Sequence, residues 1–84
     1  MELVAIGQIE IEEGLVLNNP TLNILNVNYS WVRHSVDVII LFNEEGSVFS
    51  HSRTYTFNTD DSGELTTLDI IGFINSHSIL KVFK

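Results

Sequence analysis

The sequence predicts a small α+β domain that is mainly β: an antiparallel sandwich or a partly closed barrel with one short helix near the C-terminus. Residues 25–31 alternate apolar and polar without a break, and residues 48–58 alternate as well. Because successive strand residues point to opposite faces, each run is a two-faced strand. After residue 63 the apolar spacing changes to that of a helix.

The first apolar segment, residues 4–11, changes phase at Gly7. Its apolar residues occupy even positions before this glycine and odd positions after it. A glycine at such a break is typical of a β-bulge, which inserts one residue and restores the buried face. We therefore expect one bulged strand here. Residues 12–14 (EEG) predict a turn, and residues 15–17 a short second strand.

Longer strands follow. Residues 18–20 (NNP) predict a loop, since Asn tolerates left-handed geometry and Pro disfavours helix before it. Residues 21–32 predict a strand with a phase slip near residues 24–25, and residues 33–35 a tight connection to the next strand.

The most apolar strand is predicted over residues 36–42 (VDVIILF). Its even-numbered and its odd-numbered residues are both apolar, with the exception of Asp37. A strand of this kind is covered on both sides by its own fold, or covered by a neighbouring subunit. Residues 44–46 (EEG) predict a hairpin turn, and residues 47–58 the following strand.

The C-terminal part predicts a helix over about residues 65–75, although Gly72 lowers its helix propensity. Thr66 and Asp69 have the spacing of a capping box, with Asp in place of the usual Glu or Gln. Residues 79–83 predict a final strand, the alternative being a continued helix. The expected order is therefore β-β-β-β-β-α-β.

Length and composition restrict the class of protein. With 84 residues, the chain is expected to form a single domain spanning residues 1–84. A core of this size rarely supplies more than about 3–5 kcal/mol, and the chain has no Cys for disulfides, so association with itself or with protein partners is expected. The net charge of −7 argues against nucleic acid and anionic membrane surfaces as partners.

The localisation expected from the sequence is cytoplasmic on synthesis. Residues 1–5 (MELVA) carry an acid where a signal peptide needs a basic region, and no apolar run approaches a membrane span. Incorporation into a virion is a further expectation, and it depends on the function proposed below.

One motif has the spacing of a calcium-binding loop. Oxygen-bearing side chains, a glycine and an acid occupy its first, third, fifth, sixth and twelfth positions: Asn58, Asp60, Ser62, Gly63 and Asp69. However, Asn replaces the first Asp, and the last ligand is Asp where a bidentate Glu is usual. We interpret residues 58–69 as a polar strand-to-helix turn and predict no metal site and no cofactor, with calcium as the open alternative.

No catalytic residues are predicted, and we expect a protein that is not an enzyme. His34, His51 and His77 are spread over two turns and a strand, so none pairs with another on one element. The adjacent Ser50-His51-Ser52 cannot form a dyad by itself, because neighbours on a strand point to opposite faces. We interpret the three histidines as surface or turn residues.

Two faces of the predicted strands are candidate interaction surfaces. The first carries aromatic and cationic residues, namely Phe49, His51, Arg53, Tyr55 and Phe57, with Tyr29 and Trp31 as expected neighbours. It is either a recognition patch or, as we favour, core aromatics with His51 and Arg53 at the edge. The second is uncharged and polar, and suits a wet protein interface, a glycan, or simply solvent: Asn26, Asn28, Ser30, Ser50, Ser52, Thr54 and Thr56.

The function predicted first is a non-enzymatic structural or interaction subunit of a larger assembly, most concretely a small bacteriophage virion or accessory protein. The alternative is a small acidic inhibitor that blocks a basic site on a host enzyme. Its acids would imitate phosphate charge, and they are Glu10, Glu12, Glu13, Asp60, Asp61 and Glu64. Glycan binding through Trp31, Tyr55 and the polar face is a third hypothesis.

Overall fold

The computed structural model describes residues 2–59 and 65–84. These residues form strands, one α-helix and one 3₁₀ turn: β1 (Glu2–Val4), β2 (Gln8–Glu12), β3 (Leu15–Asn18), β4 (Thr21–Ser30), β5 (Ser35–Asn43), β6 (Ser50–Asn58), α1 (Thr67–Ser76) and η1 (Leu80–Val82). The predicted fold class, mainly β with one short helix towards the C-terminus, is confirmed. No helix among the described residues is long and apolar enough to cross a membrane.

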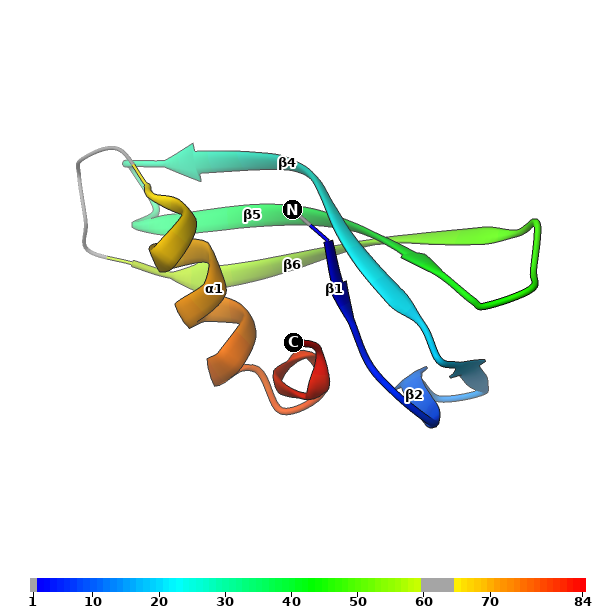
Figure 1. Cartoon of the computed structure of the whole chain (residues 1–84). Coiled ribbons are helices and arrows are strands. Elements are labelled where there is room, and N and C mark those ends of the chain that lie inside the picture. Colours follow the sequence, from blue (N-terminus) through cyan, green and yellow to red (C-terminus); the bar gives the residue numbers. More distant parts are fainter. Residues whose placement is uncertain (1, 60–64) are drawn as a thin grey trace.

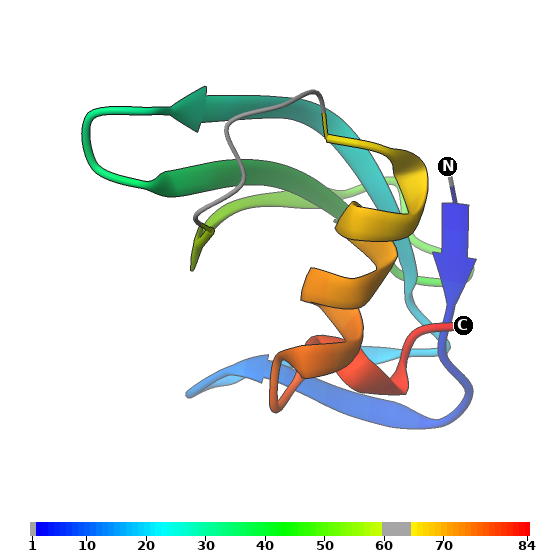
Figure 2. The ribbon, with the colours of Figure 1, turned by 90° about the vertical axis from the view of Figure 1, so that its left-hand side faces the viewer.

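The strands form two antiparallel sheets. One has the order β1-β4-β5-β6, and the other consists of β2 and β3. The helix α1 and the turn η1 lie over one face of the four-stranded sheet, as Figures 1 and 2 show. The β2–β3 hairpin lies beyond β1, towards the end where β5 turns into β6 (Figure 1).

The core lies between the four-stranded sheet and these covering elements. The even-numbered apolar residues of β5 are fully buried, and the covering elements contribute buried residues of their own: Ile11, Leu17, Ile70, Ile74, Leu80 and Phe83. Phe42 of β5 contacts Phe83 with ring centroids 5.6 Å apart. Phe57 of β6 stacks on Phe73 of α1 at 5.2 Å. Complete burial of side chains of this kind contributes about 1.5–3 kcal/mol each.

The predicted turns and the predicted slip in β4 are confirmed. Gly14 has φ 85° and Gly46 has φ 79°, a left-handed conformation that other residues adopt only with strain. The register between β4 and β5 shifts between Ile24 and Asn26, which makes Leu25 a bulged residue. The extra residue lets both halves of β4 direct their apolar side chains to the same core.

The prediction of a bulge at Gly7 is wrong. The chain leaves β1 there and enters β2, which belongs to the other sheet. Gly7 has φ 96°, its N–H donates to Asn19 Oδ1 at 2.7 Å, and its carbonyl accepts from the Asn19 N–H at 2.8 Å. The phase changes because two separate strands face the core from different directions.

The prediction of a final strand over residues 79–83 is also wrong. His77 Nδ1 accepts hydrogen bonds from the N–H groups of Ile79 at 3.1 Å and Leu80 at 3.3 Å, and this cap starts the 3₁₀ turn η1. The turn buries Leu80 and Phe83, which are three residues apart. The capping box predicted at Thr66 and Asp69 is confirmed.

The expectation that β5 is covered on both sides within its own fold is wrong for the part of the chain that the structure describes. Val36, Val38, Ile40 and Phe42 are fully buried, whereas the odd-numbered residues from Asp37 to Asn43 keep part of their surface accessible. The alternative, that a neighbouring subunit covers the second side, stays a prediction.

Candidate interaction surfaces

The side of the four-stranded sheet that faces away from α1 is here called the outer face. Antiparallel partners point to the same side of a sheet, so the register assigns its members. One row across it joins Asn26, Ile39 and Thr54, and the next joins Asn23, Leu41 and Ser52. By the same register, the uncharged polar residues that the sequence grouped together all lie on this face: Asn26, Asn28, Ser30, Ser50, Ser52, Thr54 and Thr56.

The outer face has an apolar centre, which the alternation along single strands does not reveal. Ile39 and Leu41 are half-buried between polar neighbours, and the bulged Leu25 is 56% exposed. Among residues 2–59 and 65–84, no element lies over this side of the sheet (Figure 2). The polar side chains around this centre are uncharged except for Asp37, whose Oδ1 accepts from Thr56 Oγ1 at 2.7 Å. An apolar centre with a polar surround is the composition of a protein interface.

The aromatic face predicted on β6 belongs mainly to the core, as favoured. Tyr55 and Phe57 pack against the buried cluster, and Tyr55 meets Phe42 edge-on at 6.3 Å. Phe49 is an exception, because it lies before β6 and is 73% exposed. Trp31 is likewise 73% exposed in the turn after β4, so it does not extend this face.

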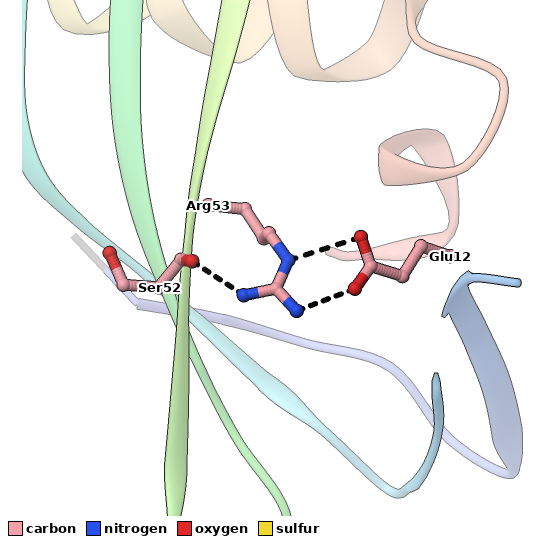
Figure 3. A network of polar contacts seen from close by, with 3 residues as sticks. All are labelled: Glu12, Ser52 and Arg53. Atoms are coloured by element: carbon pink, nitrogen blue, oxygen red, sulfur yellow. Dashed lines mark hydrogen bonds and ion pairs between the residues drawn. The ribbon is translucent and has the colours of Figure 1, made fainter. Parts of the chain in front are cut away.

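Arg53 leaves the core face at the edge of β6 and binds Glu12 at the end of β2 (Figure 3). Its Nε and Nη2 donate to the two carboxylate oxygens at 3.2 and 2.5 Å, and its Nη1 donates to the Ser52 carbonyl at 2.7 Å. The hydrogen bond from Arg53 lowers the pKa of Glu12. Burial, followed by the charge of Glu12, raises the pKa of Tyr55. The ion pair between Arg53 and Glu12 connects the two sheets, although these residues are 41 positions apart in the sequence.

Exposed apolar side chains gather at the hairpin connections. Trp31 and Val32, at 73% and 69% exposure, lie in the β4–β5 connection, and Val48 and Phe49, at 93% and 73%, lie in the β5–β6 connection. These connections are at opposite ends of the long sheet (Figure 1), in a molecule with extents of 40 × 20 × 19 Å. Both ends of the sheet therefore carry exposed apolar side chains.

The surface of the described chain includes two hollows near β4. The larger, of about 390 Å³, is lined by Val4, Ala5, Ile6, Asn19, Thr21, Asn43, Glu44 and Glu45. Glu44 is held by the backbone and side-chain N–H groups of Asn18, both at 2.9 Å. The smaller, of about 240 Å³, lies between β4 and the start of α1. The residues lining them include no histidine and no serine.

The three histidines occupy separate places. His34 is in the β4–β5 turn with φ 51°, His51 is on β6, and His77 caps η1 and meets Tyr55 edge-on at 5.0 Å. His77 is therefore a structural residue, a role that its position in the sequence did not indicate. Within residues 2–59 and 65–84, no group of three or more metal-binding side chains comes together.

Of the characteristic positions of the motif with calcium-loop spacing, Asp60, Ser62 and Gly63 lie outside the described residues. At the two ends of the motif, Asn58 is the last residue of β6, and Asp69 Oδ2 accepts a hydrogen bond from the Thr66 N–H at 2.8 Å. That bond gives Asp69 the capping role that we favoured.

The structure describes only some of the acidic residues that the inhibitor hypothesis requires. Glu10, Glu12 and Glu13 are exposed, and Glu12 is engaged by Arg53. The other three, Asp60, Asp61 and Glu64, lie outside the described residues. In comparisons with known proteins, no family model, no curated protein and no solved structure matches the chain.

Proposed function

We propose that the chain is a non-enzymatic interaction subunit that works within a larger assembly. The observation that carries this proposal is the outer face, with the apolar Ile39, Leu41 and Leu25 at its centre and no covering element in the described chain. The small size of the domain supports it, because association supplements a core that contributes only a few kcal/mol. A small bacteriophage virion or accessory protein is the concrete form of the proposal, and it rests on size and composition alone.

Affinity in such an assembly comes from two sources. Contact with the outer face removes Ile39, Leu41 and Leu25 from water, at about 25 cal/mol for each Å² of apolar surface. Strand edges contribute backbone hydrogen bonds to a partner. The uncharged Asn, Ser and Thr side chains around the apolar centre can bond either to a partner or to trapped water.

Light scattering over a range of protein concentrations, combined with the variant Ile39→Asn, tests the proposal. We expect the wild-type mass to rise above 9.5 kDa with concentration, and the variant to associate more weakly while keeping its far-UV circular dichroism. Because apolar contacts are little screened, added salt is expected to leave the association almost unchanged. A wild-type mass fixed at 9.5 kDa, or equal association of the variant, would contradict the proposal.

The acidic inhibitor is the second candidate function. Glu10 and Glu13 are exposed on the β2–β3 hairpin and add to a net charge of −7. Binding of a basic enzyme site through such charges weakens steeply as salt is added. Measuring how the affinity for a partner changes with salt concentration therefore distinguishes the inhibitor from the assembly subunit.

A further inference from the structure

The outermost strand β6 directs a regular row of backbone groups away from the sheet. The Thr59 N–H donates to the His34 carbonyl at 2.8 Å, so residues 34 and 59 form a hydrogen-bonded pair. The β5–β6 register continues without a shift, and in an antiparallel ladder such pairs alternate with pairs whose groups point outwards. The outward-pointing residues are therefore Ser50, Ser52, Thr54, Thr56 and Asn58.

An independent contact supports this assignment. Arg53 Nη1 donates to the Ser52 carbonyl at 2.7 Å, which places that carbonyl at the edge and not in the ladder with β5. Because a carbonyl oxygen has two lone pairs, it can accept a second hydrogen bond from an added strand. Glu12 holds the same guanidinium from the other side, so Arg53 has a fixed position beside the edge.

Apart from the charged Arg53, this edge lacks the features that usually prevent strand addition. Residues 50–58 contain no Pro, Gly or Lys, and their pairing with β5 has no bulge. Arg53 is the strand's single Lys, Arg, Asp or Glu residue, and its charge is paired with Glu12. In the sheet order, β6 has a neighbour only on the β5 side among the described strands. A straight, nine-residue edge of this kind is a template for another strand.

The strand is complementary to itself in one register. We propose that β6 pairs antiparallel with β6 of a second copy, with Thr54 opposite Thr54 at the two-fold axis; this rests on the proposed function and names the partner. All nine residues of β6 then overlap, and the five outward-pointing residues of each strand form about ten hydrogen bonds, two for each pair. The two sheets become one continuous sheet.

Side chains favour this register over its neighbours. Arg53 lies opposite Tyr55 of the second copy, where a guanidinium and an aromatic ring attract each other. On the outer face, Ser52 lies opposite Thr56 of the second copy, and no like charges meet. A shift that centres the pairing on Arg53 puts two guanidinium groups opposite each other and is destabilised.

A single cysteine tests the register directly. The chain has no Cys, and hydrogen-bonded partners have Cα atoms about 5.5 Å apart, within the range of a disulfide. We expect Thr54→Cys to form a disulfide-linked dimer under mild oxidation. The matched control Ser50→Cys, also exposed on β6, faces Asn58 of the second copy and is expected to cross-link far less. Equal cross-linking of the two variants would overturn the proposal.

A charge exchange tests the same contact without oxidation. Thr54→Lys and Thr54→Glu each place like charges at the two-fold axis and are expected to weaken self-association about threefold to fivefold, whereas an equimolar mixture restores it. Gln8→Lys is the control, because it makes the same charge change at an exposed residue of β2, which lies neither on the outer face nor on β6. Circular dichroism checks that each variant folds.

The outcomes separate this inference from the proposed function. If the protein associates and Ile39→Asn weakens association, but Thr54→Cys cross-links no better than Ser50→Cys, then the outer face is the interface and the pairing of β6 is wrong. If the Thr54 variants act as expected and Ile39→Asn has no effect, then the edge is the interface and the proposed role of the outer face is wrong. A protein that remains monomeric overturns the β6 dimer.

Discussion

Val38→Asp is expected to unfold the protein. Val38 has no exposed surface, and its cross-strand partners Val27 and Tyr55 bring no positive charge. Losing the buried valine costs about 1.5–3 kcal/mol. Leaving a carboxylate buried without a partner costs about 3–5 kcal/mol more. The sum exceeds the roughly 3–5 kcal/mol that a domain of this size gains on folding.

Urea denaturation followed by far-UV circular dichroism measures the effect, and Leu41→Asp is the matched control. Leu41 is on the same strand but on the outer face, where solvent reaches it, so its replacement is expected to cost about 1–2 kcal/mol and to leave a folded monomer. Cooperative unfolding of Val38→Asp within about 1 kcal/mol of the wild type would refute the assignment of the two faces.

Three smaller changes test other parts of the structure. Arg53 lowers the pKa of Glu12 in the folded state, so the pair stabilises the protein above the unfolded value near 4.5 and loses this effect as pH falls through the lowered pKa. The difference in Tm between the wild type and Glu12→Gln is therefore expected to shrink in acid, and a difference independent of pH would refute it. Thr66→Ala removes the helix cap and is expected to cost about 1 kcal/mol in urea denaturation, with Thr67→Ala as a control that leaves the cap intact. Gly72→Ala is expected to raise stability by about 0.8 kcal/mol, because an added Cβ there meets nothing within 4 Å; a loss of stability would contradict the helix geometry.

Local signals in the sequence predicted the strands, the turns and the helix cap. The alternation along β4 and β6 revealed both strands, and the slip near Ile24 and Leu25 revealed the bulge. These features depend on a few neighbouring residues, and each has a direct chemical cause. The conformation at Gly7 does not follow from the local pattern, because a change of phase at a glycine is common to a bulge and to a crossing between sheets.

Features that depend on distant parts of the chain could not be predicted. The partner of Arg53 lies 41 residues away, so no spacing rule connects it to Glu12. The 3₁₀ turn η1 depends on a cap from the His77 side chain, which competes with the strand propensity of the segment around Leu80. Ile39 was recognised as apolar, but only the register placed it on the outer face.

The elongated form of the molecule has a consequence for hydrodynamic measurement. Its radius of gyration is 13.2 Å, whereas a compact domain of this length is expected to have about 12 Å. A particle twice as long as it is wide diffuses more slowly than a sphere of equal mass, so calibrated gel filtration would make one copy look heavier than it is. Sedimentation equilibrium avoids this confusion, because its readout does not depend on friction.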